Sequence, residues 1–158
     1  DDMQAMAPTS GPAVDLGVKV GSVAPEFKAM DTTGKEQSLG AYKGRAVVLQ
    51  FFGTMFKAST ASCAQTQALY DDFADKKVTF LGVACRELSD TASAEFWKGN
   101  KFTYPLIAKG GDDLAKTYHV MGFPSVCVIG HDGNVVAFFQ DTPDRDALAE
   151  AVRKAMPH

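Results

Sequence analysis

Two short, unbroken apolar runs constrain the fold of this chain more than any other feature. Residues 46–52 read AVVLQFF and residues 78–85 read VTFLGVAC. Runs of this length without polar alternation predict strands that are buried on both faces, as in the centre of a parallel sheet. Between them, residues 57–76 follow a helical period that places a set of side chains on one face. This set is Cys63, Thr66, Leu69, Tyr70 and Phe73.

The rest of the chain continues this alternation and then departs from it. A short extended piece covers residues 104–108, and helical patterns cover residues 91–98, 112–119 and 144–156. Residues 125–130 and 134–140 read as two strands, joined by His131, Asp132 and Gly133 as a tight hairpin. Alternating strands and helices followed by a hairpin predict an α/β fold, with a central mixed sheet and helices on both faces.

Length and composition restrict the classes of protein to consider. A chain of 158 residues favours one domain, which we expect to cover residues 18–158. Residues 1–17 contain prolines, glycine and small residues without a period, and we expect a flexible arm or linker there. The net charge of −3 and the lack of a basic stripe argue against nucleic-acid binding. No apolar run of about 18 residues is present, so we expect no transmembrane segment in the chain.

Three cysteines and three histidines give no metal-type cluster. Cys63, Cys85 and Cys127 include no CxxC pair, and neither His119 nor His131 has a partner at metal-ligand spacing. We therefore expect no metal and no cofactor.

Three stretches together carry a resemblance to one superfamily. They are VGSVAPEF at residues 20–27, LGAYKGRAVVLQFFGT at 39–54 and GFPSVCVIGHDGNVV at 122–136. The chain resembles the thioredoxin-like redoxins, and most of all the alkyl hydroperoxide reductase/thiol-specific antioxidant branch. That branch includes exported thiol–disulfide oxidoreductases that serve cytochrome c maturation. The resemblance extends over residues 18–156 and implies a thioredoxin-like fold.

The resemblance also locates a redox site that has lost its sulfur. In the family, an aromatic-small-Thr-Trp pattern at the end of the strand precedes a Cys-x-x-Cys pair. Aligning this pattern on residues 51–54 places Met55 at the tryptophan and Phe56 and Ser59 at the two cysteines, so Phe56-Lys57-Ala58-Ser59 replaces the pair. A dithiol exchanger needs a thiolate attacker and a resolving thiol. Phe56 can supply neither, and Ser59 is a poor nucleophile without a base.

Two further comparisons with the family agree with this interpretation. Gln50 occupies a strand position where relatives often carry a buried acid or amide, and an amide accepts no proton at neutral pH. Residues 46–63 contain no proline, so the Pro-x-x-x-Thr-x-x-Cys arrangement of the peroxidatic relatives is also absent. In contrast, residues 122–125 match the family's Gly-x-Pro-Thr element. The resemblance implies that Pro124 is cis and that the edge before it holds an extended peptide of a partner.

The positions of the three cysteines suggest different roles. Cys63 lies about two turns into its expected helix, beyond the reach of the helix dipole, and shares a face with apolar residues, which favours a core position. Cys85 ends a strand at the sheet edge where α/β proteins bind ligands. A Cys63–Cys85 disulfide is conceivable, and Cys127, inside VCVI, is expected to be core.

The sequence therefore leads to two functional hypotheses. The first is a thioredoxin-like domain with a degenerate redox site that binds a protein or peptide through Met55, Phe56, Phe123 and Pro124 without dithiol exchange. The second is a thiol–disulfide oxidoreductase or thiol peroxidase that uses Cys63 or Cys85. The resemblance to exported proteins and the start at Asp1 lead us to expect an extracytoplasmic location after removal of a signal.

Overall fold

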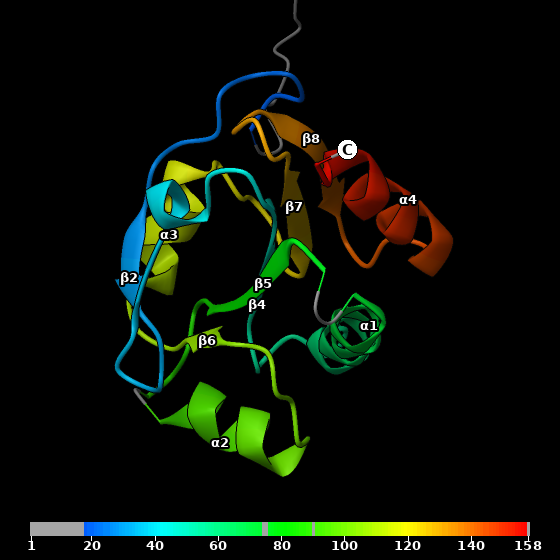
Figure 1. Cartoon of the computed structure of the whole chain (residues 1–158). Coiled ribbons are helices and arrows are strands. Elements are labelled where there is room, and N and C mark those ends of the chain that lie inside the picture. The colour runs from blue at the N-terminus through cyan, green and yellow to red at the C-terminus, as the bar shows by residue number, and fades with distance from the viewer. Residues whose placement is uncertain (1–17, 74–75, 90, 158) are drawn as a thin grey trace, which may run out of the picture.

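A five-stranded mixed sheet forms the centre of the molecule, with helices on both faces (Figure 1). The computed structural model describes residues 18–73, 76–89 and 91–157, so the expected arm at residues 1–17 lies outside the described residues. The strand order is β6-β5-β4-β7-β8. The strands are β4 (Ala46–Phe52), β5 (Val78–Ala84), β6 (Leu106–Ile107), β7 (Ser125–Ile129) and β8 (Val135–Gln140).

The two apolar runs form the middle of this sheet. β4 runs parallel to β5 and antiparallel to β7, and every residue of β4 is buried. β6 continues the parallel part on one side, and β8 continues the antiparallel part on the other. The predicted α/β fold with a mixed central sheet is confirmed.

The central sheet divides the interior into two cores, and helices cover each of them. Alternate residues of β4 face opposite sides, so that Val48 and Phe52 enter one core and Leu49 and Phe51 enter the other. The helices α1 (Ser59–Asp72), α2 (Ala92–Gly99) and α4 (Arg145–Ala155) contribute to the first core, and α3 (Gly111–Thr117) contributes to the second. Figure 1 shows α1 and α4 on one side of the sheet and α3 on the other.

A small layer covers the second core near the start of the described chain. It consists of the hairpin β2 (Lys28–Met30) and β3 (Glu36–Ser38), followed by the 3₁₀ helix η1 (Leu39–Tyr42). The buried Asp31 carboxylate holds the hairpin turn by accepting hydrogen bonds from Thr33, Lys35 and Gln37.

The predicted element order is correct, but several boundaries differ. α1 begins two residues later than expected because consecutive turns occupy the residues before it, with the amide of Ser59 donating to the carbonyl of Phe56. The expected extended piece at residues 104–108 reduces to the two-residue strand β6. Pro105 directly precedes that strand and has no amide hydrogen to extend the ladder.

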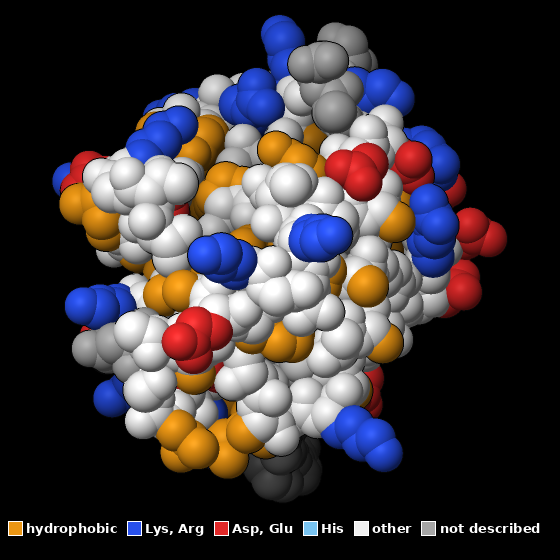
Figure 2. Space-filling model, turned by 90° about the horizontal axis from the view of Figure 1, so that it is seen from below, with side chains coloured by type: hydrophobic (Ala, Val, Ile, Leu, Met, Phe, Trp, Pro, Cys, Tyr) orange, Lys and Arg blue, Asp and Glu red, His pale blue; other side chains and the backbone are white. Residues whose placement is uncertain are grey.

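The outer surface over α1 and α2 has an ordinary solvent-facing character. Figure 2 shows hydrophobic side chains there in small groups between charged and polar ones. Among the described helices, none combines the length and the apolar character needed to cross a membrane.

Candidate functional site

The strand-to-helix turn at residues 53–58 forms the floor of the candidate site. The amide of Phe56 donates to the carbonyl of Gly53 at 3.0 Å. A Cβ atom on Gly53 would lie 2.7 Å from the carbonyl oxygen of Cys85 and 2.7 Å from the ring of Phe56. Glycine is therefore required at position 53, because the Phe56 ring and the end of β5 both approach its backbone closely.

Phe56 does not project freely into solvent but stacks on a second aromatic ring. Its ring centroid lies 5.4 Å from that of Phe123, with an angle of 20° between the planes. Phe123 belongs to the loop before β7, and its peptide bond to Pro124 is cis. The structure thus brings together the two segments that carry the family motifs, although 67 positions separate the two rings in the chain.

The four residues expected to form a binding surface differ in accessibility. Met55 is 57% exposed, Phe56 and Phe123 are half-buried, and Pro124 is buried. Pro124 therefore supports the loop from beneath and does not itself present a surface. Met121, in the same loop, is 63% exposed and adds a second methionine. We refer to Met55, Phe56, Met121 and Phe123 as the Met–Phe surface.

Ser59, which the resemblance aligns with the second family cysteine, has a structural hydrogen bond. Its side chain is buried, and its Oγ accepts the amide of Gly53 at 3.2 Å. No hydrogen bond to a histidine or a carboxylate is seen for this hydroxyl among the described residues, so it has no base to activate it.

A carboxylate fixes the other side of the turn. Both oxygens of Glu87 accept hydrogen bonds from Thr54, one from the amide at 2.8 Å and one from the hydroxyl at 2.7 Å. Because Glu87 lies in the loop after β5, this pair ties that loop to the turn at residues 53–58. The two loops therefore form one rigid edge of the sheet.

Gln50 belongs to a buried network beneath the site. Its Nε2 donates to Ser62 Oγ at 2.9 Å, and its Oε1 accepts the hydroxyl of Tyr104 at 2.5 Å. The same hydroxyl lies 3.3 Å from the carbonyl of Cys63. Each polar group of the Gln50 side chain thus has a partner, which is what a buried amide requires.

All three cysteines are free and fully buried. Cys63 lies in the core beneath α1, whereas Cys85 and Cys127 lie in the core beneath α3. The conceivable Cys63–Cys85 disulfide is not formed, because the two side chains belong to cores on opposite faces of the sheet. Within the described residues, no group of three or more histidine, cysteine or acidic side chains is placed to hold a metal ion.

Burial also suppresses ionisation of these thiols. Desolvation raises the pKa of Cys63 and that of Cys127 to about 12, and it raises the pKa of Cys85 well above the ordinary value, with the nearby charges of Asp112 and Glu87 adding to the shift. Since the thiolate is the reactive form of cysteine, none of the three is poised as a nucleophile in this conformation.

The comparison with protein families assigns the chain. A model of the AhpC/TSA family matches residues 20–138, which is well over half of the chain. The chain belongs to the AhpC/TSA family.

Curated proteins similar to this chain include thiol–disulfide oxidoreductases. The chain is 29% identical over 140 residues to the thiol-disulfide oxidoreductase ResA of Bacillus thuringiensis, covering 89% of this chain and 80% of that protein. The thioredoxin-like redoxin domain is thus shown by sequence as well as by fold.

Solved structures confirm the thioredoxin-like fold. A thiol:disulfide interchange protein of the thioredoxin family from Chlorobium tepidum superposes with a TM-score of 0.77 at 21% identity, covering 89% of this chain and 99% of that one. The pneumococcal exposed lipoprotein thioredoxin from Streptococcus pneumoniae gives a TM-score of 0.70 at 24% identity, with coverages of 82% and 99%.

Two residues beside the site were not identified from the sequence. Arg86 is the second residue after β5, and its guanidinium carbon lies 5.7 Å from the centroid of the Phe123 ring. Met121 precedes Phe123 by two positions. The sequence could have suggested Arg86 as a site residue. It follows one buried strand, and the carboxyl ends of neighbouring parallel strands lie at the same edge of the sheet. Its contact with Phe123 depends on the fold and could not be inferred from spacing.

Proposed function

We propose that this AhpC/TSA-family domain binds an extended segment of a partner protein at the Met–Phe surface without exchanging disulfides. The observation that carries the proposal is the Phe56 ring. It occupies the position of the family's first cysteine and stacks on Phe123, beside the cis-proline edge that the resemblance associates with peptide binding. A phenyl ring there replaces a reactive sulfur with a contact group.

The three cysteines of the chain are unsuited to disulfide exchange. Exchange needs a thiolate that reaches the substrate disulfide and a second thiol that resolves the mixed disulfide. Cys63, Cys85 and Cys127 are each buried, and their pKa values are raised. None of them reaches the Met–Phe surface as a side chain in this structure.

The composition of the surface supports binding. Met55 and Met121 are flexible, polarisable side chains that adapt to varied partners, and both are mostly exposed. The stacked rings of Phe56 and Phe123, each close in the chain to one of these methionines, provide a rigid apolar platform that loses little conformational entropy when it is covered. An exposed group of this kind on a soluble domain marks an interaction site more often than a scattered single residue does.

Peptide display tests this proposal directly. A library of random nine-residue peptides is selected on the wild-type protein, and the selected peptides are then measured against the Met55→Ser/Met121→Ser double variant. We expect binding to the double variant to be about tenfold weaker, because two apolar contacts are lost. Both methionines are exposed, so the fold should be unaffected, which circular dichroism checks.

Met30 provides a matched control, since it is 55% exposed and lies in β2 rather than in the Met–Phe surface. Met30→Ser should bind the selected peptides as the wild type does. The proposal is contradicted if no peptide is enriched, or if the enriched peptides bind the Met55→Ser/Met121→Ser protein as tightly as the wild type.

The alternative is an enzyme that uses Cys63 or Cys85. One contact favours Cys85 over Cys63, since the backbone carbonyl of Cys85 lies directly beneath Gly53 in the site. Its thiol instead points toward the carbonyls of Val83 and Gly111, at 3.6 and 3.5 Å. If this alternative holds, the protein consumes peroxide and Cys85→Ser loses that activity. We expect the wild-type protein to consume peroxide no faster than buffer alone does.

We also propose an extracytoplasmic location. Support comes from the relatives, which include a protein described as an exposed lipoprotein thioredoxin. Fractionation of the native cells tests this, and recovery of the protein only with cytoplasmic markers would contradict it.

A further inference from the structure

Two exposed cations flank the Met–Phe surface. Lys57 directly follows Phe56, and the guanidinium of Arg86 lies over the ring of Phe123 in the stacked pair. Neither cation forms an ion pair with any residue that the structure describes. The surface therefore combines apolar contact groups with two cationic side chains that form no ion pair among the described residues.

The nearby carboxylates accept hydrogen bonds from neighbouring loop residues. Glu87 uses both oxygens to hold Thr54. Asp112, in the first turn of α3, accepts the backbone amide of Arg86 at 2.9 Å. These acids shape the loop after β5 without forming an ion pair with the Arg86 side chain.

The conformation of Arg86 is unusual for its residue type. Its φ angle of 57° lies in the left-handed region, which a long side chain adopts at a cost. Such strain persists where surrounding contacts impose it, and here the Asp112 hydrogen bond and the Phe123 ring both restrain the residue. A guanidinium that stacks on a ring still presents its N–H edges, which match the two oxygens of a carboxylate.

The separations on this surface fit a short segment of extended chain. The centroids of the two rings lie 5.4 Å apart, and the guanidinium carbon of Arg86 lies 5.7 Å from the Phe123 centroid. An extended peptide rises about 3.3 Å per residue, so at most about three residues separate a side chain on Phe56 from one on Arg86.

We propose that the partner segment is acidic as well as apolar, with a large apolar side chain on the Met–Phe surface and, within about three residues of it, a carboxylate on Arg86. Lys57 adds attraction for further acidic residues. This inference rests on the proposed function and specifies the chemistry of the segment that binds there.

Three display pools test the charge preference. Each pool contains nine-residue peptides with a central Phe or Leu, and the positions two and three residues to either side are Glu in the first pool, Gln in the second and Lys in the third. We expect the Glu pool to be retained on the wild-type protein about five- to tenfold better than the Gln pool, and the Lys pool least. The preference should shrink as salt is added.

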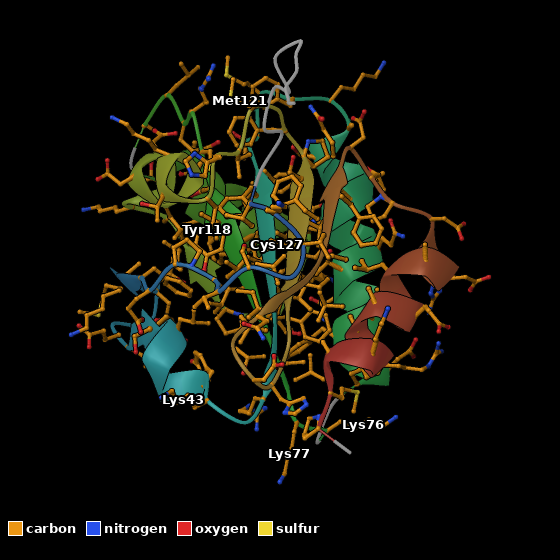
Figure 3. All side chains as sticks on the ribbon, turned by 90° about the horizontal axis from the view of Figure 1, so that it is seen from above. Lys43, Lys76, Lys77, Tyr118, Met121 and Cys127 are labelled. Atoms are coloured by element: carbon orange, nitrogen blue, oxygen red, sulfur yellow. The ribbon has the colours of Figure 1, made fainter. Side chains whose placement is uncertain are left out.

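Variants of Arg86 distinguish the contribution of its guanidinium group to this preference from the contribution of positive charge alone. Arg86→Gln should remove most of the preference for Glu over Gln, while Arg86→Lys should retain part of it. Both variants carry the same backbone strain, so their folding is matched. Lys43→Gln is the control cation: Figure 3 shows Lys43 at the end of the molecule opposite Met121. It should leave the preference unchanged.

Each outcome has a defined meaning. Equal retention of the Glu and Gln pools, or an unchanged Glu preference in Arg86→Gln, overturns the acidic partner while the proposed binding surface stands. Retention of no pool overturns both. If the protein proves to self-associate through Met55 and Met121, measured by sedimentation of the wild type and the double variant, a second copy is the occupant and the acidic segment is excluded.

Discussion

The contact between Gly53 and Phe56 determines what this site can do. The family resemblance aligns Phe56 with a cysteine, and in the structure its ring lies against the backbone of Gly53 and on Phe123. That a ring replaces the sulfur here stays a prediction from the motif. The stacking on Phe123 could not be predicted from the sequence, because it depends on how two distant loops meet.

Gly53→Ala tests the close approach of the Phe56 ring. The new methyl group would clash with the Cys85 carbonyl and with the ring, and backbone atoms cannot yield as a flexible side chain can. We expect a loss of about 1–3 kcal/mol in the free energy of unfolding, measured by urea denaturation. Gly99→Ala is the control, because no atom lies within 4 Å of its Cβ position and it ends α2. That variant should be neutral or more stable, and equal behaviour of the two would refute the close approach.

The buried thiols predict a loss of stability in alkaline solution. A folded-state pKa of about 12 for Cys63 and Cys127, against an ordinary value of 9.0, means that the unfolded chain releases these protons first as the pH rises. Stability should therefore be unaffected by these groups below pH 9 and fall above it, with a slope approaching about 1.4 kcal/mol per pH unit for each thiol.

Urea denaturation of the wild type and of Cys127→Ala between pH 8 and 10 measures this effect. The variant should show a shallower decline than the wild type, whatever its stability at neutral pH. Identical slopes would show that the Cys127 thiol is not protected in the folded protein.

At the scale of elements, the strands were easier to predict than the ends of the helices. Unbroken apolar runs identified β4 and β5 because strands buried on both faces need no polar alternation. The start of α1 was placed too early because its N-cap, Ala58, forms no side-chain capping bond that the sequence could reveal. The burial of Ser59 and Ser62 was also missed, since their hydrogen bonds to Gly53 and Gln50 join separate elements.

The network of Gln50, Ser62 and Tyr104 links β4, α1 and the segment before β6 beneath the site. Tyr104→Phe keeps the ring and leaves Gln50 Oε1 without its donor in a buried position. We expect a loss of about 1–3 kcal/mol in the free energy of unfolding. Tyr70→Phe is the matched control, because Tyr70 is only half-buried and no hydrogen bond of its hydroxyl is found among the described residues. Equal costs for the two variants would show that the network contributes nothing specific.

At the scale of the whole molecule, three loops meet at one end of the sheet to form the site. They are the turn after β4, the loop after β5 and the cis-proline loop before β7. The family resemblance predicted that the first and third would face each other. The second loop contributes Arg86 and Glu87, and neither was predicted, because the position of that loop follows from the pairing of β4 with β5 and from the hydrogen bonds of Thr54.

The central claim is that the fold of a thiol–disulfide oxidoreductase is intact here while its sulfur chemistry is absent. Reduction of insulin by dithiothreitol tests both parts in the wild type and in the Phe56→Cys/Ser59→Cys double variant. In the variant, one introduced thiolate would attack an insulin disulfide and the other would resolve the mixed disulfide, after which dithiothreitol would reduce the new disulfide again.

We predict that insulin is reduced no faster with the wild type than with dithiothreitol alone, and that the double variant increases the rate of insulin reduction. Turnover by the wild type at the rate of the double variant would contradict the loss of exchange chemistry. An inactive double variant with a native circular dichroism spectrum would contradict the assignment of positions 56 and 59 to the redox pair.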